Sequence, residues 1–243
     1  MAATETGVWD LQDVRDKQLE SEWSYDANDP HTLYAWGRDS QGELGLNYKA
    51  PGSGGSRSSP TQVGTNSNWN TVADGKESNF TIGTKTDGTL WSWGSNGSAQ
   101  LGHNNGTDYS SPMQLPGTFP TGGTGYTASG GRYHAAILNS AGELYTMGSN
   151  NEGQLGHNNR TNYSSPRQVP GSWKYLITSD EATAAIKTDG TMWAWGHNEY
   201  GEVGNNKSGP SNNGISSPTQ VGTLDGFATM GSAQHSFFGL REA

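Results

Sequence analysis

The sequence predicts an all-β fold, a β-propeller of about four blades with a short N-terminal helical extension. A motif made of an aromatic-rich strand, a loop and a Ser-Ser-Pro segment recurs at intervals of about 50 residues, a period typical of propeller blades. The composition favours many short strands and tight turns, because 36 of the 243 residues are Gly and only 30% are hydrophobic. In addition, the two ends of the repeat region carry complementary halves of one hairpin.

Four copies of the motif mark the repeats. Their strands cover residues 33–37, 90–94, 144–148 and 192–196. Each strand leads into a [Gln/Glu]-[Leu/Val]-Gly loop, and the copies close with Ser-Ser-Pro at residues 58–60, 110–112, 164–166 and 216–218. We therefore divide the chain into an N-terminal docking or anchor segment, residues 1–30, and a propeller, residues 31–243.

The N-terminal segment differs from the repeats in composition, because it holds most of the acidic excess of the chain. Asp10 can cap a helix over residues 10–21, with further acids near its positive end. The apolar side chains that could dock are Val8, Trp9, Leu11, Val14, Leu19 and Trp23. They are too few to fold alone, so the segment either covers the end of the propeller or binds another protein.

Each full repeat also predicts a hairpin. Residues 79–84 connect to 90–93 across Asp87-Gly88, and residues 183–186 connect to 192–195 across Asp189-Gly190. Asp-Gly between alternating runs favours a type I′ turn, which has positive φ at both central residues. Residues 134–138 pair likewise with 144–147 through Ala141-Gly142.

The motif strands alternate large and small side chains. The large ones are Tyr34 and Trp36, Trp91 and Trp93, Tyr145 and Met147, and Trp193 and Trp195. They point to one face, opposite the small residues Ala35, Ser92, Thr146 and Ala194. We expect the large side chains to fill the space between blades.

The fourth hairpin is split between the ends of the repeat region. Residues 33–36 lack a preceding partner strand, and residues 236–240 lack a following one. Pairing of these two strands would close a four-bladed ring and remove its open edges.

These repeats resemble the regulator-of-chromosome-condensation repeat over residues 31–240. The resemblance rests on the motif strand, the [Gln/Glu]-[Leu/Val]-Gly loop, Ser-Ser-Pro and a following Gly-x-x-His strand. It implies a propeller with each repeat staggered across two blades, although known members usually have seven blades. The strand His is matched by His134 and His235 and replaced by Phe80 and Ala182.

The same family includes guanine-nucleotide exchange factors that bind chromatin and an inhibitor of β-lactamase. The first activity requires a basic surface, whereas this chain has a net charge of −9 and no basic cluster. We therefore expect no nucleic-acid partner. A second, shorter resemblance covers residues 7–17, which are similar to a stretch in virion proteins of tailed bacteriophages.

Several chemistries are not expected from the sequence. It contains no Cys, no Gly-x-Ser-x-Gly elbow and no phosphate-binding loop, so we expect no catalytic residues, no cofactor and no enzyme activity. His103 and His157 occupy equivalent loop positions in different repeats and should lie too far apart to share a metal ion, so we expect no metal site. We also expect no membrane insertion and no cleaved signal, because no apolar run is long enough.

The loops between the motif strand and Ser-Ser-Pro remain for recognition. They carry four candidate binding residues, Tyr48, Tyr109, Tyr163 and Tyr200. The alternative is that these tyrosines pack back on the blade edge.

Together, these observations predict a non-enzymatic virion protein of a tailed phage, such as a decoration, fibre or tail-associated protein. Residues 7–30 would dock to other virion proteins, and the loops would face outward toward a host-surface glycan or protein. The alternative is a free cytoplasmic protein-interaction module or inhibitor. A glycan-binding module is a further alternative that is compatible with both.

Overall fold

The computed structural model describes residues 31–48, 55–75, 79–117, 126–209 and 214–242. The docking segment expected at residues 1–30, with its helix over 10–21, lies outside the described residues. Residues 31–243 form one compact unit. Within the part that the structure describes, no helix has the length and hydropathy needed to span a lipid bilayer.

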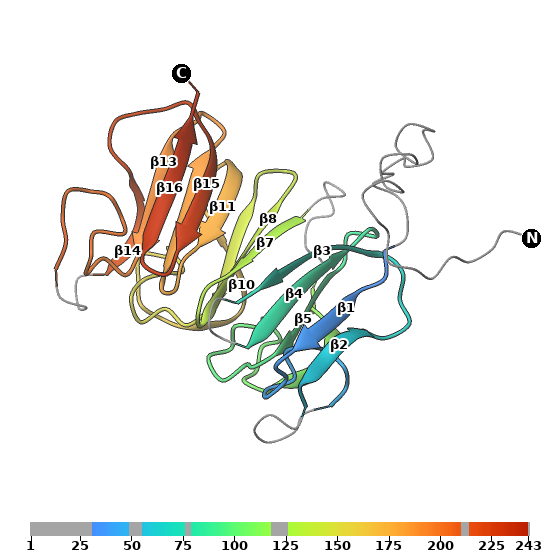
Figure 1. The fold of residues 1–243 in the computed structure, drawn as a ribbon. Coiled ribbons are helices and arrows are strands. Elements are labelled where there is room, and N and C mark those ends of the chain that lie inside the picture. Colours follow the sequence, from blue (N-terminus) through green and yellow to red (C-terminus); the bar gives the residue numbers. More distant parts are fainter. Residues whose placement is uncertain (1–30, 49–54, 76–78, 118–125, 210–213, 243) are drawn as a thin grey trace, which may run out of the picture. The chain divides into compact units, whose positions relative to one another are not determined.

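Three four-stranded antiparallel sheets form the full blades (Figure 1). The first full blade comprises β3 (Trp69–Asp74), β4 (Phe80–Lys85), β5 (Leu90–Gly94) and β6 (Tyr109–Gln114). The second comprises β7 (Tyr126–Gly130), β8 (His134–Asn139), β9 (Leu144–Gly148) and β10 (Tyr163–Val169). The third comprises β11 (Trp173–Thr178), β12 (Ala182–Lys187), β13 (Met192–Gly196) and β14 (Ile215–Gln220). The sequence motif therefore forms the third strand of each blade.

A two-stranded sheet precedes the full blades in the sequence, and another follows them. The N-terminal half-blade consists of β1 (Tyr34–Gly37) and β2 (Arg57–Gln62). The C-terminal half-blade consists of β15 (Phe227–Ala233) and β16 (Ser236–Arg241). The predicted closure of the ring is not seen, because β1 pairs with β2 and β16 with β15 among the described strands. The structure is thus a propeller fragment with several four-stranded sheets.

The predicted hairpins are present, but their turns differ from the predicted type. Thr84 pairs with Leu90, and the Gly88 N–H donates to the Lys85 carbonyl at 3.0 Å. Gly88 has a φ of 79°, whereas Asp87 is not among the residues with positive φ. A turn with an i to i+3 hydrogen bond followed by one left-handed Gly is typical of a three-residue hairpin loop. It is not a type I′ turn, which needs positive φ at both central residues. Gly190 closes the equivalent turn of the third blade.

Apolar side chains between consecutive blades form the core. Phe80, Ile82 and Ile137 belong to a cluster shared by the first and second full blades. Trp173 and Trp195 belong to one shared by the second and third. A third cluster, which includes Met230, joins the third blade to the C-terminal half-blade. The fold is therefore held together by contacts between neighbouring repeats.

The large residue at the end of each motif strand packs against the loop of the preceding repeat. The Trp93 indole N–H donates to the Glu43 carbonyl at 3.0 Å, and the Trp195 N–H donates to the Gln154 carbonyl at 2.9 Å. The loop glycines allow this approach, because a Cβ on Gly156 would lie 2.8 Å from the Trp195 indole nitrogen. Trp93 and Trp195 are 1% and 0% exposed.

The first motif strand lacks such a cover. Trp36 is 61% exposed and Tyr34 is also exposed, so the expectation that they lie between blades is not met in the described structure. On β16, Phe238 and Leu240 are exposed as well. Among the described residues, neither half-blade has a further repeat on its open side that would cover these side chains.

Candidate functional site

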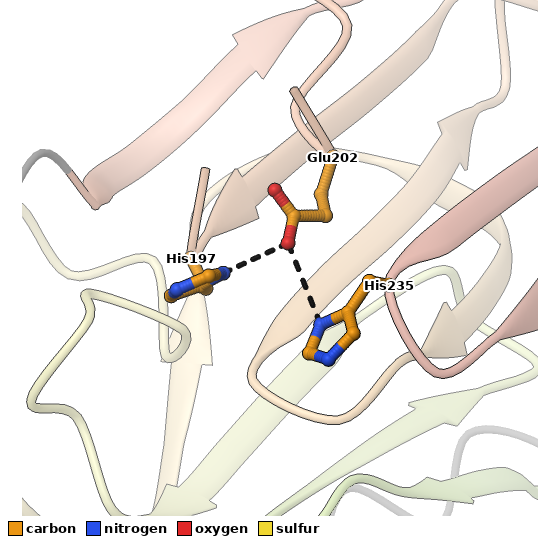
Figure 2. A group of neighbouring side chains, drawn as sticks. All are labelled: His197, Glu202 and His235. Carbon is orange, nitrogen blue, oxygen red and sulfur yellow. Dashed lines mark hydrogen bonds and ion pairs between the residues drawn. The ribbon is translucent and has the colours of Figure 1, made fainter. Parts of the chain in front are cut away.

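Three titratable side chains meet between the third blade and the C-terminal half-blade (Figure 2). His197 and Glu202 lie in the loop that follows β13, and His235 lies in the turn between β15 and β16. We call these three residues the His-Glu-His cluster. One ligand-type atom from each lies within 4.8 Å of the others.

The backbone holds this geometry. The His197 N–H donates to the Glu181 carbonyl at 2.9 Å, and the Tyr200 N–H donates to Glu202 Oε2 at 3.0 Å. The other carboxylate oxygen, Oε1, lies 2.8 Å from His197 Nδ1 and 3.6 Å from His235 Nδ1. One carboxylate oxygen therefore faces both imidazole rings.

Burial and neighbouring charges both act on the pKa of His197. The side chains of Glu202 and His197 are 1% and 8% exposed, whereas that of His235 is 37% exposed. Burial lowers the pKa of His197, but the hydrogen bond and charge of Glu202, with the charges of Glu181 and Glu152, outweigh it and raise the pKa overall. The surroundings of His197 are therefore acidic and favour a cation.

An adjacent cavity of about 250 Å³ lies on the same loop. Glu202, Gly204, Tyr200, His235 and Phe237 are among its lining residues. The ring centroid of Tyr200 lies 5.2 Å from that of His235. In two other repeats the equivalent loop is covered by a tryptophan, Trp93 at Glu43 and Trp195 at Gln154. At Glu202 and Gly204 the same place is an open cavity.

The other repeats build the same loop without the histidines. Ser149 takes the place of His197, because its N–H donates to the carbonyl of the residue before β8 in the same way. Gln154 takes the place of Glu202, since its Oε1 accepts the Glu152 N–H at 2.9 Å. The residue that precedes β16 is His235, and Glu181 precedes the equivalent strand β12. The cluster therefore arises where His197, Glu202 and His235 occur together at three positions of a frame that the repeats share.

The regulator of chromosome condensation (RCC1) repeat model matches residues 87–138, 141–179 and 189–238. These matches cover more than half of the chain. The chain belongs to the RCC1 repeat family. Each matched segment begins near a motif strand and runs into the next blade, as the staggered repeats predict.

Curated RCC1 relatives share low identity with the chain. It is 29% identical over 181 residues to the mitochondrial RCC1 domain-containing protein RUG3 of Arabidopsis thaliana, and 27% identical over 208 residues to the E3 ubiquitin-protein ligase HERC2 of Homo sapiens. The alignments cover 71% and 82% of this chain, but 39% and 4% of those proteins. It is also 30% identical to human protein RCC2 over 143 residues, which are 57% of this chain and 27% of that protein.

Two solved structures share the fold of this chain. Prp20p of Saccharomyces cerevisiae superposes with a TM-score of 0.71 at 20% identity, over 87% of this chain and 52% of that one. Human WBSCR16 superposes with a TM-score of 0.73 at 21% identity, over 88% and 54%. The chain thus spans about half the length of the propellers that it matches.

The sequence predicts that His134 and His235 both occupy the strand position of the RCC1 histidine, but the structure places only His134 there. His134 begins β8 and is fully buried, with Nε2 3.0 Å from Thr183 Oγ1. Burial lowers its pKa to about 3. His235, by contrast, lies in a turn, and Ser236 occupies the strand position because β16 has the same register to β15 as β12 has to β11. The match of His235 to the strand His is therefore wrong.

The candidate loop tyrosines of this RCC1 chain separate into two environments. Tyr109 and Tyr163 are partly buried, and their hydroxyls accept hydrogen bonds from Asn105 and Asn159, each at 3.1 Å. Tyr48 and Tyr200 are exposed, with side chains at 48% and 67% accessibility. Tyr200 alone among the four joins the His-Glu-His cluster, through its ring contacts.

The two loop histidines considered for metal binding stay in separate repeats. His103 Nε2 lies 2.9 Å from Ser92 Oγ, and His157 Nε2 lies 3.0 Å from Thr146 Oγ1. Each ring also packs edge-on against the tyrosine of its own loop. Burial lowers the pKa of both, that of His157 to about 4. Both residues therefore anchor their loops as neutral imidazoles.

Sequence reasoning missed the His-Glu-His cluster. His235 lies far from His197 and Glu202 in the sequence, and it was matched to the strand histidine of the repeat. The available signal was His197, which stands where the other repeats carry Arg38, Ser95 and Ser149, whereas a Glu at the position of Glu202 also occurs in the first repeat as Glu43. The docking residues predicted in the N-terminal segment, Val8, Trp9, Leu11, Val14, Leu19 and Trp23, lie outside the described residues.

Proposed function

We propose that the chain is a non-enzymatic protein-interaction module that assembles through the unpaired edges of its two half-blades. The observation that carries this proposal is the exposure of Trp36 on β1 and of Phe238 and Leu240 on β16, at 61%, 62% and 68%. Apolar side chains beside unpaired backbone groups favour the addition of a strand from another chain.

The two half-blades are complementary halves of one blade. By motif, β1 is the equivalent of β5, and by register β16 is the equivalent of β4. In the first full blade β4 pairs with β5, placing Ile82 opposite Ser92. The same register places Phe238 opposite Ala35. Each half-blade therefore lacks the strands that the other carries.

The cavity beside Tyr200 supports the same pairing. Trp93 and Trp195 each occupy the loop of the preceding repeat, and the loop at Glu202 and Gly204 is the last of the series. In the part of the chain that the structure describes, Trp36 is the motif tryptophan that no preceding loop covers. A β16–β1 pairing would bring Trp36 to this cavity, with its indole N–H directed at the Glu202 carbonyl.

We propose a second copy of the chain as the partner. The full blades follow the arc of propellers about twice as long, as the superpositions over about half of those chains indicate. Closure within one chain would require each blade to turn about twice as far. Two copies can instead close one ring through two identical β16–β1 contacts, because head-to-tail interfaces form rings when the rotation closes.

Disulfide trapping of the full chain tests the proposal, since the native sequence has no Cys. The double variant Ala35→Cys with Phe238→Cys places thiols opposite each other in the expected register, where Cα atoms of paired strands lie about 4.5–5.5 Å apart. Mild oxidation should give a covalent dimer, seen by non-reducing electrophoresis, and light scattering of the wild type should give twice the chain mass.

The control pair is Ala35→Cys with Arg241→Cys, which displaces the second thiol by about 10 Å along β16. It should not crosslink. A crosslinked monomer in the test pair would instead support closure within one chain and the predicted four-bladed ring. Absence of any crosslink, together with a monomer in light scattering, would refute assembly through these edges.

Other functional predictions stay untested. Nothing in the family match or the relatives above supports a tailed-phage virion protein, and the residues predicted to dock lie outside the described ones. The virion and cytoplasmic locations, and glycan binding through the loop tyrosines, therefore stay predictions. The ligase activity in the name of HERC2 belongs to that protein.

A further inference from the structure

We propose that His197, Glu202 and His235 bind a divalent transition-metal ion, with Zn²⁺ as the reference ion. The three residues offer two imidazole nitrogens and one carboxylate oxygen, a donor set that zinc uses in sites with a fourth, open position. The proposal is independent of the proposed assembly, because all three ligands belong to one copy of the chain.

The distances fit a four-coordinate site after small adjustments. With zinc–ligand bonds of about 2.0–2.1 Å, tetrahedral ligands lie about 3.4 Å apart. Glu202 Oε1 lies 2.8 Å from one imidazole Nδ1 and 3.6 Å from the other, on either side of that value. Figure 2 shows both rings directed at this oxygen. The two imidazole nitrogens lie within 4.8 Å of each other and would have to lie about 3.4 Å apart in the occupied site.

The second shell of a zinc-bound histidine is also present. The other ring nitrogen of His197, Nε2, faces Glu199 Oε2 at 3.6 Å. A carboxylate at this place orients a metal-bound imidazole and increases its basicity. The ion would take the place of the hydrogen bond between His197 Nδ1 and Glu202 Oε1. The neighbouring charges of Glu181 and Glu152 stabilise a divalent cation there.

The same loop forms elsewhere in this chain without the cluster. One repeat earlier, Ser149 and Gln154 form the same backbone contacts, and Glu181 stands where His235 stands. Ser149 and Gln154 already make these structural contacts without a histidine or a carboxylate. We therefore look for a role of His197 and Glu202 beyond holding the loop. The exposed imidazole of His235 gives an ion a path from solvent.

The experiment measures zinc binding by the full chain. The purified protein is stripped with EDTA, dialysed against Zn²⁺ alone and assayed for bound metal, and Co²⁺ is added separately to record the visible absorption of a tetrahedral site. We expect one zinc per chain and a tetrahedral cobalt spectrum. The variant His197→Ser with Glu202→Gln carries the residues of the preceding repeat, so it should fold and bind no zinc.

Two further variants keep the test decisive. His235→Ala changes a partly exposed turn residue and should weaken zinc binding by at least about 10-fold. His157→Gln removes a histidine outside the cluster and should bind zinc like the wild type. Wild-type protein without zinc after dialysis, or equal binding by the wild type and the His197→Ser, Glu202→Gln variant, would overturn the proposal. Circular dichroism in EDTA verifies that each variant is folded.

Discussion

His134 should make the stability of the protein depend on pH between about 6.5 and 3. Its imidazole is fully buried at the start of β8, and burial lowers its pKa to about 3. Thr183 Oγ1 donates to the Gln154 carbonyl, so it accepts from the His134 Nε2–H. The folded protein therefore holds a neutral imidazole, whereas the unfolded chain has a pKa of about 6.5 at this residue.

The sign and size of the effect follow from proton linkage. Above pH 6.5 the residue is neutral in both states and has no effect on the pH dependence. As the pH falls below 6.5, the unfolded state binds a proton that the folded state does not, so the free energy of unfolding decreases until the folded pKa is reached. At pH 5 the decrease is about 2 kcal/mol, at about 1.4 kcal/mol per pH unit.

The assay compares urea unfolding of the wild type and His134→Phe at pH 7 and pH 5. Phenylalanine suits the position, because Phe80 pairs with Gly94 in the same register in which His134 pairs with Gly148. His103 and His157 titrate in both proteins, so their contributions cancel in the difference. The wild type should lose about 2 kcal/mol more than the variant between the two pH values.

A second variant separates packing from titration. His134→Ala reproduces Ala182, the residue at this position in the third blade, and leaves a cavity that lowers stability at every pH. Its pH dependence should nevertheless match that of His134→Phe. If both variants retain the full wild-type slope between pH 7 and pH 5, the buried imidazole is not the group responsible and the reasoning fails.

Three further substitutions test the loops. Gly156→Ala should destabilise by more than the roughly 1–2 kcal/mol of a left-handed backbone, because its Cβ would meet the Trp195 indole, and a thermal melt measures this. Asn150→Ala removes one accepted and two donated side-chain hydrogen bonds to the loop backbone and should cost about 2–3 kcal/mol in urea unfolding. Tyr163→Phe removes the bond from Asn159 and should cost about 1 kcal/mol by the same assay.

Local features of the fold were predictable from the sequence because they depend on neighbouring residues. Asp-Gly and Ala-Gly sequences fixed the position of each hairpin, although the choice between turn types depended on one φ angle at Asp87 that the dipeptide alone does not determine. The strand alternation likewise predicted that Trp93 and Trp195 are buried.

Long-range features were not predictable in the same way. The cluster requires that the turn at His235 meets the loop at Glu202, and the register of β16 against β15 decides which residue enters the turn. Matching the repeats by motif aligned His235 with the strand histidine, one residue away from its place in the structure. The contact between His235 and Glu202 was therefore not predicted. Where repeats differ at such positions, the pairing register of the adjacent strands must be known before a side chain can be assigned to a site.

The half-blades follow from how the repeats pack. A motif tryptophan is covered by the loop of the repeat before it and not by its own, as Trp93 with Glu43 and Trp195 with Gln154 demonstrate. A series of such repeats that is not closed must leave one bare tryptophan at its beginning and one unfilled loop at its end. Trp36 and the cavity at Glu202 are these two elements. Periodicity predicts that each tryptophan is buried, but only a closed ring makes this true for every repeat.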